Sequence, residues 1–341
     1  MKKSTKIWLI TATSLVALGC IMFSVAMTKI HWDFTKLSTV KYETNTYEVT
    51  DDFNSISMLT DTADILFVQS DDKICKVVCY EMSDMKHTTT VQNDTLTINV
   101  IDEREWYDHI GIMSGGDAYL RVYLPAKTYE SLTVDVTTGD VTVGRDFSFS
   151  GNVTLSVTTG DVTLSASVQG DTRLEATTGD LLVEGAHQAL TVTAGTGDVT
   201  IRKCEIDSIS VTTGSGDVTL EELTAAGAVR VKTTTGEQSL SRVTCGELEL
   251  DVNTGDVTLT DTAASGSLRA ETTTGDVTLT RADAATLHLK TTSGSVKGSL
   301  RTPKIFYTDT TSGSVDVPKS TEGGHCEIET TSGSIRITIE E

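Results

Sequence analysis

One short motif recurs through the second part of this chain and constrains its fold more than any other feature. It first appears as Val-Thr-Thr-Gly-Asp-Val-Thr-Val at residues 136–143, and its glycine returns ten more times at intervals of 18 to 21 residues. The recurring glycines are Gly139, Gly160, Gly179, Gly197, Gly216, Gly236, Gly255, Gly275, Gly294, Gly313 and Gly333. A repeat of this length is typical of solenoids, in which each unit is stable only when stacked on its neighbours.

Each repeat reads as a strand, a corner and a second short strand. Apolar and polar residues alternate from Leu132 to Thr137, so Leu132, Val134 and Val136 should face a core. Glycine tolerates a positive φ and aspartate bonds nearby backbone, so Gly139-Asp140 should turn the chain. An antiparallel meander of hairpins also fits this pattern. The constant period favours an all-β parallel β-solenoid (β-helix) of roughly 19–20-residue coils, with equivalent residues stacked about 4.8 Å apart.

An apolar segment precedes the repeats. Residues 7–27 contain no charged side chain, and Lys2, Lys3 and Lys6 come before them. This length can cross a bilayer as one N-terminal transmembrane helix, and the positive flank predicts a cytoplasmic N-terminus. Two alternatives stay open: cleavage of a signal peptide after Ser24-Val25-Ala26, and lipidation of Cys20. The predicted divisions are a cytoplasmic tail at 1–6, a transmembrane anchor at 7–29 and a juxtamembrane linker at 30–46.

Residues 47–127 are rich in strand patterns without a clear period. Ala63-Asp64 has the position of a worn Gly-Asp corner, and Asn93-Asp94 is typical of a hairpin turn. Residues 104–117 read as an irregular loop. Terminal solenoid repeats must cover the core, so we predict a β-rich capping region at 47–127 and the repeat β-solenoid at 128–341. The last strand, residues 335–339, should be an exposed edge whose terminal acids discourage pairing.

The repeated T-T-G-D-V-T-L and T-T-S-G-S-V units, together with the segment Val122–Lys127 before the first regular coil, resemble the DUF4097-type β-solenoid family of bacterial putative adhesins. The resemblance covers roughly residues 47–341. It implies an extracytoplasmic domain of the bacterial envelope, often membrane-anchored, and some relatives belong to envelope-stress operons. It implies no functional residues.

Aspartate follows most of the corner glycines. The column consists of Asp140, Asp161, Asp180, Asp198, Asp217, Asp256 and Asp276, with Glu237 interrupting it. Stacked carboxylates repel one another, and a calcium column would relieve that repulsion. The nine-residue period of calcium-binding β-rolls is absent. The simpler interpretation is that each aspartate completes its turn, so no metal is predicted and calcium remains the alternative.

The remaining composition argues against several function classes. A formal charge of −21 disfavours binding to nucleic acid or to anionic lipid. The acids are periodic rather than clustered, the six histidines lack metal-ligand spacing and no nucleophile motif is evident, so no enzymatic activity, cofactor or small-molecule substrate is predicted. Cys75 and Cys79 on one strand should lie about 13 Å apart, too far for a disulfide.

We therefore expect a single-pass protein of the bacterial cell membrane with most of its chain outside the cytoplasm. Its predicted function is that of a non-enzymatic, adhesin-like interaction scaffold with a protein or envelope partner. The alternative is a tethered accessory of an envelope-stress or membrane regulatory system. A calcium-stabilised surface protein is a more remote alternative.

Overall fold

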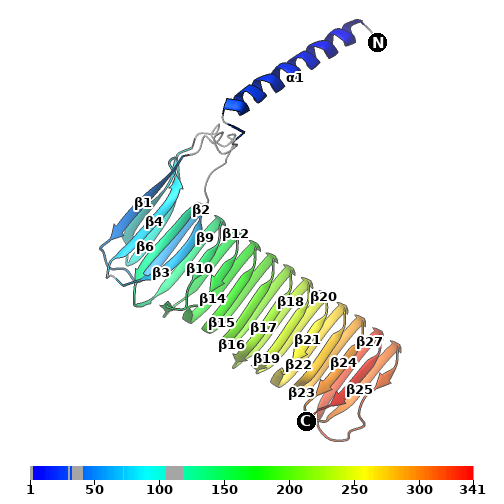
Figure 1. Ribbon diagram of the computed structural model, residues 1–341. Coiled ribbons are helices and arrows are strands. Elements are labelled where there is room, and N and C mark those ends of the chain that lie inside the picture. Colours follow the sequence, from blue (N-terminus) through cyan, green and yellow to red (C-terminus); the bar gives the residue numbers. More distant parts are fainter. Residues whose placement is uncertain (1–2, 30, 33–40, 72, 105–117, 341) are drawn as a thin grey trace.

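The computed structural model consists of one N-terminal helix followed by a long stack of strands (Figure 1). The structure describes residues 3–29, 31–32, 41–71, 73–104 and 118–340. Helix α1 (Lys3–Lys29) contains a segment, Thr5–Lys29, that is long and apolar enough to cross a membrane. Most of the predicted irregular loop at 104–117 lies outside the described residues.

All strands belong to one 28-stranded sheet that winds around a single core. The first seven strands are β1 (Tyr42–Val49), β2 (Ser55–Thr62), β3 (Asp64–Ser70), β4 (Cys75–Met82), β5 (Met85–Gln92), β6 (Thr95–Asp102) and β7 (Tyr119–Pro125). The early coils contain β8 (Thr128–Tyr129), β9 (Ser131–Thr138), β10 (Val141–Val143), β11 (Ser148–Phe149), β12 (Val153–Thr159), β13 (Val162–Leu164), β14 (Ser167–Thr178) and β15 (Leu181–Thr196). The middle coils contain β16 (Val199–Ser215), β17 (Val218–Ala225), β18 (Ala228–Thr235), β19 (Gln238–Cys245), β20 (Glu247–Thr254), β21 (Val257–Thr260) and β22 (Ala263–Thr274). The last coils contain β23 (Val277–Ser293), β24 (Val296–Leu300), β25 (Lys304–Ser312), β26 (Val315–Asp316), β27 (Gly324–Ser332) and β28 (Ile335–Ile339).

The pairing of the strands confirms the predicted parallel β-solenoid. Val141 pairs in parallel with Val162, and Val162 pairs in parallel with Leu181 in the next coil. These three side chains are at most 1% exposed. The strands on the two sides of a corner therefore pair with their equivalents in neighbouring coils, not with each other. This arrangement excludes the meander of hairpins.

The N-terminal end is closed by antiparallel strands. Strands β6 and β7 form the outermost parallel coil, next to the coil made by β2 and β3. Strands β4 and β5 then run antiparallel to β7 and β6, and β1 runs antiparallel to β4. Asn93 and Asp94 both have positive φ, which confirms the predicted hairpin turn between β5 and β6. The prediction of a linker up to residue 46 is wrong, because residues 42–46 already pair with β4.

Strands β2 and β3 form a true coil of the solenoid inside the predicted capping region. Ala63-Asp64 lies directly beside Gly139-Asp140, since the Ala63 N–H donates to Thr138 O and Asp64 Oδ1 accepts from the Asp140 N–H. The worn corner was therefore identified correctly. A side chain as small as alanine is accommodated here.

The C-terminal coils are stacked in a different order from the sequence. After β24 the chain first builds the outermost coil, β25 and β26, and then returns to insert β27 and β28 underneath it. The prediction that residues 335–339 form an exposed edge is therefore wrong for Ile335 and Arg336, which pair with β24 on one side and with β26 on the other. Among the described strands, residues 337–339 pair with β24 alone, and β25 and β26 form the outer coil. The N-terminal end has a similar exchange, because β2 and β3 lie between β6/β7 and β9/β10.

The corner glycines are needed for two reasons, which Gly255 illustrates. Its φ is +149°, and a Cβ at this position would lie 2.0 Å from the Gly236 carbonyl oxygen of the preceding coil. At Gly333 no such φ occurs, yet a Cβ would meet Gly294 O at 1.9 Å. Close contact between successive corners therefore excludes a side chain even where the backbone conformation would allow one.

Candidate functional site

The aspartate column is built into the backbone of the stack. The Oδ1 atom of Asp140 accepts the Asp161 N–H at 2.8 Å, and Asp161 Oδ1 accepts the Asp180 N–H at 2.7 Å. The same contact continues through Asp180, Asp198, Asp217, Asp256 and Asp276 at 2.7–2.9 Å. We expected each aspartate to bond its own turn. Each carboxylate instead joins two coils through a hydrogen bond from the backbone N–H of the next corner.

This geometry bears on calcium, because one carboxylate oxygen of each aspartate in the column is already engaged. At the end of the column, Asp276 Oδ2 also accepts from Lys297 Nζ at 2.9 Å. The backbone N–H of Ser295 and then Lys297 lower the pKa of Asp276. A calcium ion prefers six to eight oxygen ligands, more than the single free oxygen per coil supplies.

We predict that the aspartate column responds to ionic strength and not to calcium in particular. Added NaCl should raise the melting temperature gradually, because screening weakens repulsion among the exposed carboxylates. Millimolar calcium at equal ionic strength should give the same melting temperature in thermal melts of the full chain. A calcium-specific gain that is lost in the Asp198→Ser, Asp217→Ser double variant would contradict this prediction.

A second corner carries charges of alternating sign, a feature that the sequence analysis missed. Five non-glycine residues with φ between 50° and 56° follow one another down the stack: Lys203, Glu222, Arg242, Asp261 and Arg281. Arg242 Nη2 donates to Glu222 Oε1 at 2.9 Å, and Arg281 Nη2 donates to Asp261 Oδ2 at 2.6 Å. The Arg281 guanidinium lowers the pKa of Asp261. These exposed ion pairs join successive coils in the same register as the pairing of their backbones.

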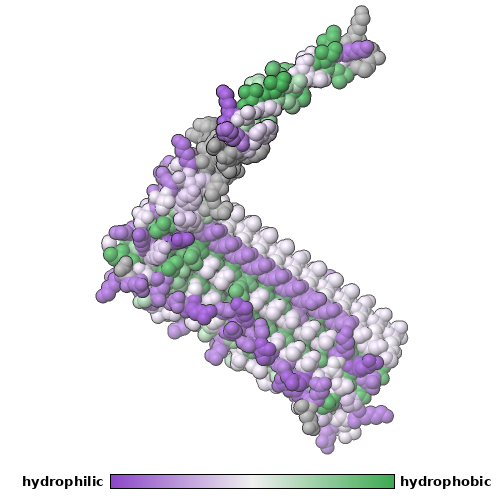
Figure 2. Space-filling model, viewed as in Figure 1, coloured by the Kyte–Doolittle hydropathy of each residue, from purple (hydrophilic) through white to green (hydrophobic). Residues whose placement is uncertain are grey.

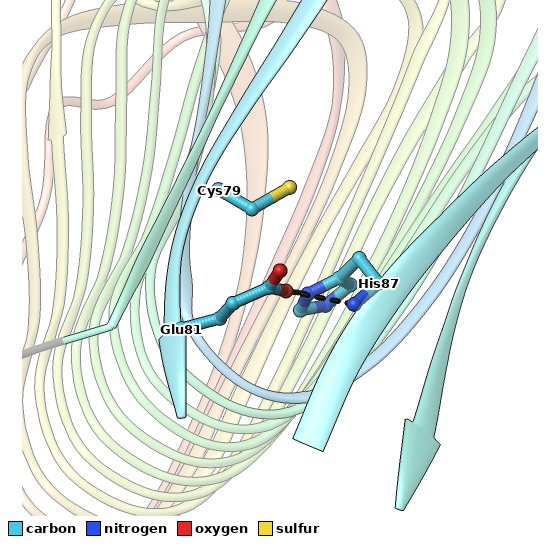
Figure 3. Close-up of side chains that lie close together, drawn as sticks. All are labelled: Cys79, Glu81 and His87. Atoms are coloured by element: carbon cyan, nitrogen blue, oxygen red, sulfur yellow. Dashed lines mark hydrogen bonds and ion pairs between the residues drawn. The ribbon is translucent and has the colours of Figure 1, made fainter. Parts of the chain in front are cut away.

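The cap contains a buried polar cluster that joins β2, β4 and β5. Figure 3 shows two of its members, Glu81 of β4 and His87 of β5, beside Cys79. His87 Nδ1 lies 2.6 Å from Glu81 Oε2, and His87 Nε2 lies 2.7 Å from Thr60 Oγ1. The His87 backbone N–H also donates to Glu81 Oε2, and Asn45 Nδ2 donates to Glu81 Oε1, both at 2.7 Å. Thr60, Glu81 and His87 are each at most 2% exposed.

Hydrogen bonds determine the charge state of this cluster. Burial by itself would raise the pKa of Glu81, but the bonds from His87 and Asn45 outweigh it and lower the pKa. The carboxylate is therefore the form that the cap stabilises. Polar groups at inward positions are stable only when their partners are in place, so this network should fix how β1, β4 and β5 pack together.

Two chemical uses of the cluster can be weighed against its geometry. The order Thr60, His87, Glu81 resembles that of a nucleophilic triad, but burial of all three leaves no surface for a substrate. Cys79, Glu81 and His87 carry ligand atoms within 4.8 Å of one another, a spacing suited to a metal ion. Both imidazole nitrogens and both carboxylate oxygens already have hydrogen-bond partners, and burial raises the Cys79 pKa to about 12. The contacts support a structural role.

The sequence analysis missed the surroundings of His87 but described Cys75 and Cys79 correctly. His87 was read as isolated, although Glu81 follows Cys75, Val77 and Cys79 at the inward positions of β4. A charged residue at an inward position is the signal that could have revealed the cluster. The expectation that Cys75 and Cys79 are not bridged is confirmed, since both are free and buried. The corner glycines and the aspartates lie along the stack and converge on no cleft.

Several solved structures are similar to this chain at low identity. A putative adhesin from Bacteroides fragilis is 15% identical, with a TM-score of 0.32, over 87% of this chain and 97% of that one. A putative lipid binding protein from Parabacteroides distasonis is 16% identical, with a TM-score of 0.41, over 75% and 96%. A putative cell adhesion protein from Clostridium sporogenes is 11% identical, with a TM-score of 0.17, over 89% and 100%. These scores are too low to support an argument about function.

No functionally curated protein has a sequence that matches this chain. The family model called Toastrack DUF4097 matches twice, at residues 53–189 and 186–338. The two matches together span the solenoid and most of the cap, including both ends at which the coil order is exchanged. The chain therefore belongs to the Toastrack DUF4097 family, as its repeated Thr-Gly-Asp corners indicated.

Proposed function

We propose that this protein is a membrane-tethered, non-enzymatic rod that displays its solenoid on the bacterial surface as an adhesin-like interaction scaffold. The observation that carries the proposal is the order of its parts. An apolar helix is followed by a closed cap and then by a stack that extends away from the cap (Figure 1). A rod of this kind separates its far end from the membrane by several nanometres, since each coil adds about 4.8 Å.

The surface of the stack suits binding to another macromolecule. Figure 2 shows hydrophilic side chains in rows that follow the length of the stack. Exposed ion pairs also link neighbouring coils, for example Arg230 with Glu249 and Lys290 with Glu329. Rows of fixed charge on a rigid support give a partner an ordered surface, and charge patterns of this kind favour specificity.

The proposed topology predicts the outcome of proteolysis on intact cells. Protease added outside should remove the cap and the solenoid, because the positive N-terminal flank keeps only a short tail inside. N-terminal sequencing of the untreated protein should recover Met1 or Lys2. A mature chain that begins at Met27 would show that α1 is a cleaved signal peptide, and full protection from protease would contradict surface display.

A second function, as a tethered accessory of a membrane regulatory system, is favoured by the outer face of the cap. Tyr80 stacks between Tyr42 and Tyr119, with ring centroids 5.2 Å and 5.5 Å apart, and the Arg121 guanidinium lies 4.9 Å from the centre of the Tyr119 ring. A hollow beside them is lined by Glu48, Ser70, Ile74, Lys76, Val78 and Tyr123. Aromatic and arginine side chains are enriched at protein interfaces.

Photo-crosslinking can separate the two functions. A crosslinking residue at Ile74, on the cap, should capture a protein of the same membrane if the accessory role holds. The same residue at Thr273, an exposed position on the stack itself, serves as the matched position for the scaffold role. Specific adducts at Ile74 alone would favour the accessory over the scaffold.

A further inference from the structure

The coil that lies farthest from the cap has an unpaired edge. Among the described residues, β25 pairs only with β27, and β26 pairs only with β28. At each inner corner the glycine N–H donates to the next coil outward, as Gly294 does to Ser332 O at 3.0 Å and Gly333 to Ser312 O at 2.9 Å. Gly313 occupies the same position in the last coil, where no further strand is described. Among the described residues its N–H has no backbone acceptor of this kind.

The apolar core is also open at this end. Between residues 118 and 340, the large apolar side chains that are exposed are Tyr307, at 54%, and Val315, at 44%. Both belong to the last coil, but only Val315 occupies a core position, because Tyr307 pairs with the outward-facing Glu327 and stacks on His325. Val296 and Ile335 occupy the same core column as Val315 in the two preceding coils, and both are fully buried. Phe306 and Val317, near them in the sequence, are only partly buried. The last coil therefore leaves core positions partly exposed, although the equivalent positions in the inner coils are buried.

Little on β25 protects it against pairing with another strand. Natural edge strands are commonly guarded by lysine, proline or a bulge. Lys304 does not act in this way, because it is buried and its Nζ donates to Ala284 O and pairs with Asp283 Oδ1, both at 2.7 Å. Asp309 is the one exposed charged residue within β25. At the other end of the stack, the edges of β1 and β5 are instead joined by the Lys86–Glu43 ion pair at 2.6 Å.

We propose that β25 pairs with β25 of a second copy of this chain, in an antiparallel, two-fold symmetric contact that joins two solenoids at their tips. Pairing centred on Thr308 places Tyr307 opposite Asp309 of the other copy, so no like charges face each other. A two-fold contact is self-complementary, and the nine residues of β25 supply a strand about 30 Å long. Val315 and Phe306 of the two copies then cover each other.

The contact gives the proposed scaffold a partner, and this step rests on the proposed function. Because α1 is attached at the cap, the paired tips lie at the far ends of both rods. Two chains anchored in facing membranes can then meet without bending. Such tip-to-tip pairing would hold two surfaces together at a separation of two rod lengths.

The full-length chain, reconstituted in lipid vesicles with its solenoid outside, tests the contact directly. Two vesicle populations that both bear the chain should cluster, as measured by light scattering, whereas mixtures with bare vesicles should not. In nanodiscs that hold one chain each, pairs should form at micromolar concentration. Chains that stay single at that concentration, with vesicles that stay dispersed, would overturn the proposal. Protease accessibility on cells tests surface display separately, so each failure can be recognised.

Two variants and a matched control locate the contact at the tip. Val315→Lys should weaken clustering by roughly tenfold or more, because two unpaired charges would be buried between the copies. Thr273→Lys, on an exposed position with three further coils between it and the open end, adds the same charge and should cluster like wild type. Equal clustering by Val315→Lys and Thr273→Lys would contradict pairing at the tip. Thermal melting identifies a variant that fails to fold.

A complementation test keeps the proposal falsifiable even if Val315→Lys unfolds. Tyr307→Asp should reduce clustering among its own vesicles, because the new carboxylate faces Asp309 of the other copy. Mixing these vesicles with vesicles that bear Asp309→Lys should restore clustering, since the introduced carboxylate of one copy then faces the introduced ammonium of the other. Failure of the mixture to regain clustering, with both variants folded, would exclude the antiparallel register.

Discussion

Substitution of Gly255 by valine is expected to disrupt the stack around this corner and to cause a large loss of stability. The backbone at this corner has a φ of +149°, and the new Cβ would lie 2.0 Å from Gly236 O and 2.6 Å from the Gly236 carbonyl carbon. Both atoms belong to the backbone of the neighbouring coil, so no side chain can move aside. Strain and overpacking together should cost at least about 3 kcal/mol.

Thermal melting of Gly255→Val beside Gly144→Ala provides the comparison. Gly144 lies in the same stack, yet nothing would come within 4 Å of a Cβ at that position. Gly144→Ala should therefore melt close to wild type. Because solenoids unfold as stacks of neighbouring units, hydrogen exchange should show that Gly255→Val opens the coils on both sides first. A Gly255→Val protein that melts with wild type would mean that successive corners are farther apart than described.

Removal of the buried Glu81 carboxylate is the second large effect that we expect. Glu81→Ala leaves the His87 N–H, His87 Nδ1 and Asn45 Nδ2 without their acceptor inside the cap. Leaving a buried hydrogen-bond donor without its partner costs about 1–3 kcal/mol, so the loss of this shared acceptor should cost about 3 kcal/mol or more. The loss should be local, with faster hydrogen exchange in β4 and β5 and little change in the solenoid. Glu43→Ala, which breaks the exposed pair with Lys86 and one bond from Asn45 but leaves the Glu81 carboxylate in place, is the matched control and should have a much smaller effect.

The same carboxylate predicts how the cap responds to acid. Hydrogen bonds lower the pKa of Glu81 in the folded state below its usual value of 4.5. The stability that it contributes is therefore complete above about pH 4.3, where the unfolded side chain ionises, and is lost as the pH falls through the folded pKa. Wild type should lose more cap stability between pH 6 and pH 3 than Glu81→Ala does. Parallel pH profiles for the two proteins would contradict the assignment.

Local patterns in the sequence were sufficient to predict the regular coils. Alternation around Leu132, Val134 and Val136, with the regular return of glycine, specifies which residues face the core and how often the chain turns. The worn corner at Ala63-Asp64 could be recognised for the same reason. The bond partner of each aspartate could not, because it lies in the next coil and depends on how closely two corners approach.

The order of the terminal coils could not be predicted from local sequence patterns either. Strands β25 and β27 both present a plausible inner row, and spacing alone does not say which lies outermost. Two features become informative in retrospect. Thr308 of β25 occupies the core column that Leu289 and Ile328 fill elsewhere, and residues 317–323 form a longer connection than any between β9 and β25. A coil with a weaker inner row is the one that a stack can leave at its end.

The distance between labels at Thr142 and Thr278 tests the stacked-coil architecture most directly. Register pairs carry Thr142 to Thr278 through Thr163, Leu182, Thr200, Thr219, Ser239 and Thr258. Seven steps at about 4.8 Å place the two positions about 34 Å apart.

Pulsed electron paramagnetic resonance on the full chain, with nitroxides at Thr142→Cys and Thr278→Cys and with Cys20 replaced by alanine, measures this separation. The five other native cysteines are buried and should remain unlabelled. We predict a narrow distribution, broadened only by the label linkers, near 34 Å. A separation near twice that value, which two strands per repeat side by side would give, would contradict the solenoid.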